Sequence, residues 1–207
     1  KLLAGSWGTL AVLTEATIKL VPKAEAQTTL VLRGLDDATA NRAMTKALGS
    51  SFDVSGAAHL PVSNLQSLDG ALAKVGAPQQ ALTLVRVEGI DVSVTDRSRS
   101  LATLLTSFGA VEMISDDESA AVWAALRDVA PFAAASPLGG YAVWRIVCPP
   151  TAGAALGTAL RRETGGEVTY DWGGGLIWAA VPPATDAHAA TVRAHTEAAG
   201  GHAMLLR

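Results

Sequence analysis

Four strand-to-helix junctions constrain the fold of this chain most strongly, because they occur as two matched pairs. Residues 33–36 (Arg-Gly-Leu-Asp) parallel residues 88–91 (Glu-Gly-Ile-Asp), and residues 148–151 (Cys-Pro-Pro-Thr) parallel residues 181–184 (Val-Pro-Pro-Ala). Each junction places turn-forming residues and a helix start at the same point of a β-α-β unit. Four such units predict an α+β fold of two ferredoxin-like halves, a duplicated and mostly antiparallel sheet with its helices on one face.

The remaining elements follow the same rhythm. Alternation of apolar and polar residues predicts strands, and apolar residues spaced by three and four predict helices, as at Leu101, Leu104 and Leu105. The three glycines at 173–175 lie between two strands and predict a tight turn rather than a phosphate-binding loop. Strands are expected at residues 28–33, 52–59, 81–88, 110–114, 141–148, 167–171, 176–181 and 202–206, and helices at 37–48, 91–107, 117–129, 151–163 and 185–199.

Composition excludes several classes of protein. The chain has 207 residues, of which 49% are apolar and 17% charged, so it can fill a substantial core. Its net charge of −3, with no basic block, argues against a nucleic-acid-binding surface. The single cysteine, Cys148, excludes a disulfide within the chain. The apolar runs are shorter than the roughly 20 residues that a membrane-spanning helix needs.

The most specific motif opens the chain. Residues 5–16 read Gly-Ser-Trp-Gly-Thr-Leu-Ala-Val-Leu-Thr-Glu-Ala. Gly5 and Gly8 leave the backbone bare where a ligand or another segment can approach. The alternation that begins at residue 16 predicts a strand that ends at Pro22. This run resembles the closing motif of the FAD-binding domain in FAD-linked oxidases of the vanillyl-alcohol oxidase type.

In that family the motif lies directly before a cap domain that covers the substrate. The resemblance implies that residues 1–22 are the last segment of a truncated FAD-binding domain and that residues 28–207 form the cap. It also implies backbone and shape contacts to the flavin from Gly5, Ser6, Gly8, Thr9 and Val12. The chain lacks a glycine-rich loop for the pyrophosphate. FAD is therefore expected in the full-length parent but not in this fragment, which should be colourless and inactive.

Shorter phrases extend the resemblance along the chain, to the FAD-binding small subunit of bacterial glycolate oxidases. They are residues 123–127 (Trp-Ala-Ala-Leu-Arg), 144–145 (Trp-Arg), 149–150 (Pro-Pro), 170–172 (Tyr-Asp-Trp) and 201–207 (Gly-His-Ala-Met-Leu-Leu-Arg). This resemblance implies a FAD-dependent oxidoreductase acting on CH–OH donors, which oxidises glycolate, a small 2-hydroxy acid, to glyoxylate. The implied partners are a sister flavoprotein subunit and an iron–sulfur subunit. The implied location is cytoplasmic, with peripheral contact to the inner membrane through those subunits.

Two arginines beside aromatic residues are the candidates for substrate binding. Arg127 and Arg145 each offer a guanidinium that could pair bidentately with a carboxylate. The alternative is that the neighbouring tryptophans are core residues and the arginines form structural ion pairs. No catalytic residue is assigned, because residues 201–203 read Gly-His-Ala where related catalytic subunits have Glu-His-Gly. The four histidines lack the spacing of metal ligands, so no metal site is predicted.

Two other functions remain compatible with the sequence. The first is a non-catalytic assembly module that holds the catalytic flavoprotein subunit, which the altered residues 201–203 favour. The second is a ligand-binding ferredoxin-like domain unrelated to flavin, in which residues 5–15 would form an ordinary edge turn. No motif of a hydrolase, a nucleoside triphosphatase or a dithiol oxidoreductase occurs.

Overall fold

The computed structural model describes residues 3, 5–6, 8–20, 22–62, 70–76 and 79–207. Within these residues, eight strands form one sheet in the order β4-β1-β3-β2-β6-β7-β5-β8, and each of its ladders is antiparallel. The strands are β1 (Ala26–Arg33), β2 (Val54–Leu60), β3 (Leu82–Gly89), β4 (Val111–Ser115), β5 (Ala142–Val147), β6 (Glu167–Asp171), β7 (Leu176–Val181) and β8 (His202–Leu205). The helices are α1 (Asp37–Leu48), α2 (Gly70–Val75), α3 (Asp91–Leu105), α4 (Asp116–Arg127), α5 (Pro150–Thr164) and α6 (Ala189–Ala198).

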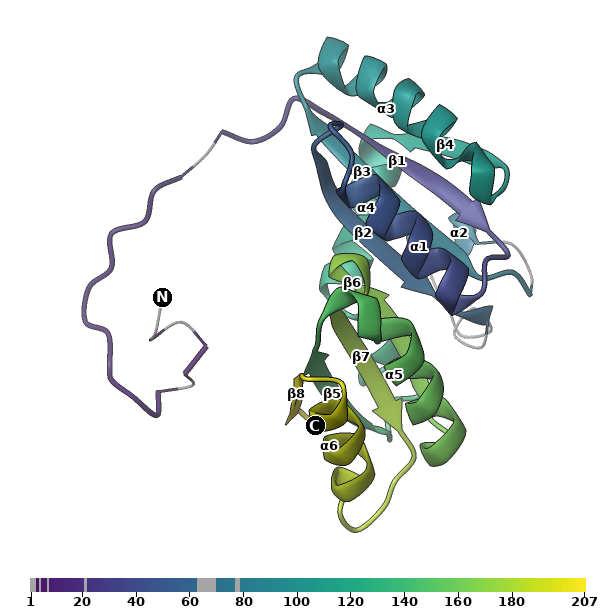
Figure 1. Cartoon of the computed structure of the whole chain (residues 1–207). Coiled ribbons are helices and arrows are strands. Elements are labelled where there is room, and N and C mark those ends of the chain that lie inside the picture. Colours follow the sequence, from purple (N-terminus) through teal and green to yellow (C-terminus); the bar gives the residue numbers. More distant parts are fainter. Residues whose placement is uncertain (1–2, 4, 7, 21, 63–69, 77–78) are drawn as a thin grey trace.

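The two halves of the sheet repeat one topology. In the first half the spatial order is β4-β1-β3-β2, and in the second half the corresponding order is β8-β5-β7-β6. A helix follows the first and the third strand of each half, which is the ferredoxin-like arrangement. The duplicated α+β fold predicted from the matched junctions is therefore confirmed. Figure 1 shows the halves end to end, joined where β2 meets β6.

Most element boundaries lie within a few residues of the predicted ones. Helix caps and backbone conformation at the junctions explain where the helices begin. The Asp36 carboxylate accepts a hydrogen bond from the Thr39 amide at 2.7 Å and so caps α1. α6 begins four residues later than expected because Ala187 and His188 have φ angles of 50° and 56°, outside the right-handed helical region.

The sheet of the first half packs on both faces. Leu30 and Leu32 of β1 point toward α1 and α3, while Val31 between them packs with α4 and α2 on the opposite face. In the second half, Trp144 and Ile146 of β5 pack against α5 and α6. The helices α1, α3, α5 and α6 therefore cover one face of the sheet, as predicted. The helix predicted at residues 117–129, α4, differs, because it lies with the short α2 on the opposite face, over the first half only.

The predicted strand after residue 16 is wrong. The structure assigns no strand to the described residues that precede β1, and we call residues 3–20, as far as the structure describes them, the arm. Val12, Ile18 and Leu20 are 86%, 74% and 84% exposed. Alternation gives a segment two distinct faces, but a strand also needs a neighbouring strand for its backbone hydrogen bonds. No strand among the described residues supplies one, and the arm extends away from the domain (Figure 1).

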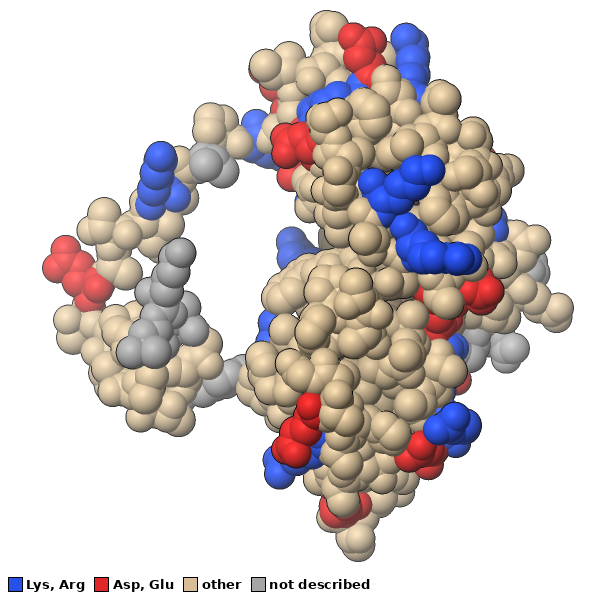
Figure 2. All heavy atoms as spheres, in the orientation of Figure 1, with Lys and Arg blue, Asp and Glu red and all other residues tan. Residues whose placement is uncertain are grey.

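The charged side chains on the face that carries α1 and α5 are separated by uncharged surface. Figure 2 shows Lys and Arg side chains over α1 and further side chains of both signs mainly toward the edges of the view, in keeping with the low charged fraction of the sequence. In the described part of the chain, the helices are too short or too polar to cross a bilayer.

The turn formed by the three glycines at 173–175, which we call the glycine turn, contacts the first half on this face. It provides a test of the packing between the halves. Gly174 has a φ of +97°, and a Cβ at this position would lie 2.2 Å from Nδ2 of Asn41. That amide donates to the carbonyl oxygens of Pro150 at 2.9 Å and Gly173 at 3.0 Å. We expect Gly174→Ala to lower the free energy of unfolding by about 2 kcal/mol, through backbone strain and the lost hydrogen bonds. Urea denaturation measures this.

Gly140 provides the matched control, since nothing lies within 4 Å of a Cβ built there. Gly140→Ala should leave the urea midpoint nearly unchanged. Equal effects of the two substitutions would contradict the packing described for the glycine turn.

Candidate functional site

A cavity of about 880 Å³ lies on the sheet face opposite α1, α3, α5 and α6. It lies where the two halves meet. On this face α4 covers the first half, and a small apolar cluster around Phe132 covers part of the second half, so the region between these two covers is left open. We call it the seam cavity. Its lining residues include three tryptophans, four cationic residues and five acidic ones, namely Trp123, Trp172, Trp178, Lys23, Arg86, Arg127, Arg145, Glu25, Glu88, Asp116, Asp117 and Asp171.

Strand alternation directs these side chains into the seam cavity. In β3, Val85 and Val87 face the helices α1 and α3, so Arg86 between them points to the opposite face. In β5, Trp144 and Ile146 are in the helix-side core, and Arg145 between them points into the cavity. Arg86 and Arg145 are each the one charged residue within an apolar run. The alternation of side chains along the strand therefore directs both of them into the seam cavity.

The first-half wall is a fixed stack of Arg86 on Trp123. The guanidinium lies 4.8 Å from the ring centroid, its Nε donates to the Ser55 hydroxyl at 3.0 Å, and it forms an ion pair with Glu88 at 3.2 Å. The Trp123 Nε1–H donates to Thr29 Oγ1 at 2.8 Å. Because its charge is already matched, Arg86 serves as a wall of the cavity rather than as a free anion-binding group.

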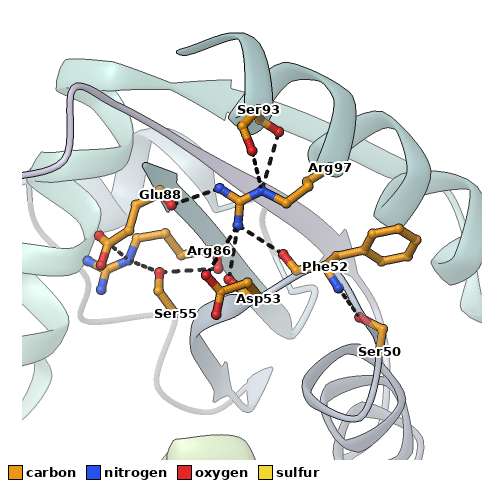
Figure 3. A network of polar contacts seen from close by, with 8 residues as sticks. All are labelled: Ser50, Phe52, Asp53, Ser55, Arg86, Glu88, Ser93 and Arg97. Carbon is orange, nitrogen blue, oxygen red and sulfur yellow. Dashed lines mark hydrogen bonds and ion pairs between the residues drawn. The ribbon is translucent and has the colours of Figure 1, made fainter. Parts of the chain in front are cut away.

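A second arginine, Arg97, holds the segment that leads into β2, next to Ser55 of the first-half wall. Arg97 of α3 donates to the carbonyl oxygens of Phe52 and Glu88 at 3.1 and 3.0 Å, and it lies 3.6 Å from the Asp53 carboxylate. Figure 3 shows this network beside the contacts of Arg86 with Ser55 and Glu88. It holds the start of β2 against β3 and α3.

The second-half wall is a stack of Arg145 on Trp172. The guanidinium carbon lies 5.4 Å from the ring centroid. Among the described residues, Arg145 has no ion pair and no side-chain hydrogen bond, so its donors are available to a ligand in the cavity. Trp172 is 54% exposed and has a φ of +52°, an unusual conformation for a bulky residue. Strained residues of this kind are concentrated at ligand sites.

Asp171 holds Trp172 in that conformation. Its carboxylate accepts a hydrogen bond from the Trp172 amide at 2.7 Å. Burial raises the pKa of the Asp171 carboxyl, and the hydrogen bond to Trp172 and the positive charge of Arg86 offset only part of this rise. A carboxyl with a raised pKa in a cavity that also holds arginines is a candidate proton donor or acceptor.

The two arginines predicted to bind substrate lie in the same cavity, but in different states. Arg127 is 75% exposed and donates from Nε and Nη2 to the two carboxylate oxygens of Asp128, at 2.8 and 3.1 Å. Of the three described arginines in the cavity, Arg86 pairs with Glu88 and Arg127 with Asp128, and Arg145 has no anionic partner among the described residues. Arg86 and Asp171 were missed as site residues, although the lone charge within the run Leu84-Val85-Arg86-Val87 was a usable signal.

The residues predicted to contact flavin lie in the arm and do not line the seam cavity. Gly5, Gly8, Thr9 and Val12 are exposed, and the Thr9 amide and hydroxyl both bond the carbonyl oxygen of Ser6, at 2.9 and 2.6 Å. Trp7 of the same motif is outside the described residues. Residues Pro22 to Gln27 nevertheless line the cavity, so the arm leaves the domain at the cavity rim.

The glycine turn does not form a cradle for a dinucleotide. A Cβ at Gly173 would lie 2.4 Å from Leu48, and one at Gly174 would meet Asn41, so the turn is filled by protein atoms. It therefore has no room for a pyrophosphate, and FAD does not fit at this turn. Within the residues that the structure describes, no three His, Cys, Asp or Glu side chains gather as metal ligands.

Comparison with known proteins identifies the fold. No family model matches the sequence, and none of the curated proteins does. Among solved structures, p-cresol methylhydroxylase with substrate bound matches 87% of this chain and 45% of its own, with a TM-score of 0.58 and 10% identity. Alkyldihydroxyacetonephosphate synthase matches 86% of this chain and 40% of its own, with a TM-score of 0.51 and 12% identity. The chain thus spans less than half of either protein and shares a fold with that portion.

Proposed function

We propose that this chain is the substrate-covering portion of a FAD-dependent oxidoreductase, and that the seam cavity receives the carboxylate of a small 2-hydroxy acid such as glycolate. The observation that carries the proposal is Arg145, a guanidinium without an anionic partner among the described residues, stacked on Trp172 in a cavity between the halves. A planar guanidinium with free donors suits a carboxylate, which it can bind through two parallel hydrogen bonds.

Two independent observations support the flavin part of the proposal. The arm carries the motif that resembles the end of a FAD-binding domain, and it leaves the domain at the cavity rim. The two solved proteins that share the fold belong to the FAD-linked oxidase family. A flavin held by another part of the parent protein would then adjoin the arm and face the cavity.

The described residues would bind and orient the ligand. Arg145 would hold the carboxylate, while the rings of Trp172 and Trp178 exclude water from one side. Asp171 would accept or donate a proton near the hydroxyl group, since its pKa is already raised by burial. The redox step belongs to the flavin, and these residues supply the binding site above it.

A flavin titration tests the proposal. We expect the chain alone to be colourless and not to bind FAD, because its glycine turn is filled. A protein extended at the N-terminus by a complete flavin domain should bind FAD, and addition of glycolate under anaerobic conditions should bleach the flavin absorbance. Absorbance spectra during both titrations measure this. Failure of the extended protein to bind FAD would refute the flavoprotein assignment.

A non-catalytic assembly module is the second candidate. It is favoured by β8, an edge strand whose exposed His202 pairs with Val147 and does not line the seam cavity. Here a sister flavoprotein subunit and an iron–sulfur subunit would be the partners, with the cytoplasmic face of the inner membrane as the place of assembly. FAD binding without bleaching by glycolate, together with copurification of such subunits, would select this function.

A further inference from the structure

Four charged or polar side chains meet at the junction of the halves, on the face opposite the seam cavity. They are Asp37 of α1, His59 of β2, Arg161 of α5 and Tyr170 of β6, and we call them the seam cluster. Asp37 accepts hydrogen bonds from the Tyr170 hydroxyl, at 2.5 Å, and from Arg161. Its other oxygen lies 3.5 Å from Nε2 of His59. Each half thus contributes two members.

The cluster is buried and tightly placed. The Asp37 side chain is 12% exposed and His59 is fully buried, with its Nδ1 at 2.9 Å from the Thr83 hydroxyl of β3. The Tyr170 ring lies beside α5 at Gly157, where a Cβ would come within 2.2 Å of the tyrosine oxygen. Only a glycine on α5 lets the hydroxyl reach Asp37.

The backbone contributes little to the junction. The ladder of β2 with β6 has one register pair, His59 with Tyr170, whereas β1 and β3 pair over the full length of both strands. Side chains must therefore fix much of the relative position of the halves. The cluster residues His59 and Tyr170 are that same register pair.

The seam cluster is connected to the cavity through β6. Successive residues of a strand point to opposite faces, so Tyr170 points to the cluster while Asp171 points to the cavity. Asp171 in turn holds Trp172, on which Arg145 stacks. Displacement of Tyr170 would consequently move the second-half wall of the cavity relative to Arg86 and Trp123 of the first.

We propose that Asp37 and Tyr170 are positioning residues that set the separation of the two cavity walls and thereby the affinity of the cavity for its ligand. The proposal rests on the proposed function only for the identity of that ligand. The separation of the two walls is a property of this chain and can be measured without any ligand.

The separation of the halves is measured by distances between spin labels in this chain. Cys148 is the single cysteine and is buried, so Cys148→Ala provides the background. Asp96→Cys on α3 and Glu197→Cys on α6 place labels at exposed positions on different halves. We expect one narrow distance distribution, and a shifted or broadened one for Tyr170→Phe and for Asp37→Asn. Tyr141→Phe and Asp36→Asn are the matched controls, because neither residue belongs to the seam cluster and asparagine still caps α1.

The effect on the ligand is measured with oxalate, whose binding at Arg145 is expected to change the fluorescence of Trp172, on which Arg145 stacks. We expect Tyr170→Phe to weaken oxalate binding about three- to tenfold, with no change for Tyr141→Phe. Unchanged distances in both cluster variants would overturn the proposal, and so would changed distances with unchanged oxalate affinity. If the unaltered chain binds neither oxalate nor glycolate, the proposed function fails, and the distance distributions alone decide the positioning role.

Discussion

Replacing Arg145 by alanine is expected to lower kcat/KM for glycolate by at least about 100-fold in the protein extended by a flavin domain. Two charge-assisted hydrogen bonds to a carboxylate would be lost, and such bonds contribute about 1.5–3 kcal/mol each. Stopped-flow measurement of flavin reduction gives the constant. Arg145→Lys should recover part of the loss, because a lysine keeps the charge but not the two parallel donors.

Arg127→Ala is the matched control for this experiment. Arg127 lies at the same cavity, but it is exposed and already paired with Asp128. Its removal should change kcat/KM less than about threefold, since exposed ion pairs are weak. A larger effect at Arg127 than at Arg145 would contradict the assignment of the carboxylate to Arg145.

Replacing Asp37 by alanine is expected to lower the free energy of unfolding by about 3 kcal/mol, among the largest effects for a single substitution outside the apolar core. The change leaves the Arg161 guanidinium and the Tyr170 hydroxyl without their acceptor. Urea denaturation near neutral pH measures it. Asp36→Asn, at the adjacent position, keeps a capping side chain and should change stability only slightly.

The same carboxylate makes stability depend on pH. Burial raises the pKa of Asp37, but the His59 ring 3.5 Å away, the hydrogen bond from Tyr170 and the charge of Arg161 outweigh it, so the folded-state pKa lies below the usual value of 3.8. A lowered pKa means that the stabilisation is complete above pH 3.8 and is lost as the pH falls through the folded-state value.

The difference in unfolding free energy between the unaltered protein and Asp37→Asn should consequently be constant near neutral pH and shrink below about pH 4. Urea midpoints measured across this range test the sign. A difference that grows on acidification would show that Asp37 is not stabilised as the carboxylate.

The topology could be predicted because its signals are local. The matched junctions at 33–36 and 88–91 fix where a strand ends and a helix starts, and the pattern repeats in the second half. The arm shows the opposite case. Its alternation from residue 16 has the pattern of a strand. Pairing, however, needs a second segment, and none of the strands that the structure describes pairs with the arm.

The site was predictable only in part, for a related reason. Arg145 was found because it interrupts an apolar run beside a tryptophan. Its stacking on Trp172 and the cavity shared with Arg86 depend on the meeting of β2 and β6. No local pattern encodes that junction, whose members Asp37 and Tyr170 are 133 residues apart.

The short connection between the arm and β1 sets a mechanical limit. Five residues, 21–25, separate the end of the arm at residue 20 from the first residue of β1. Five extended residues span roughly 18 Å at most. Any body that engages the arm is therefore tethered beside the cavity rim, where so short a tether gives an effective concentration on the order of millimolar. Closure of such a body over the cavity would then be an intramolecular equilibrium, independent of the protein concentration.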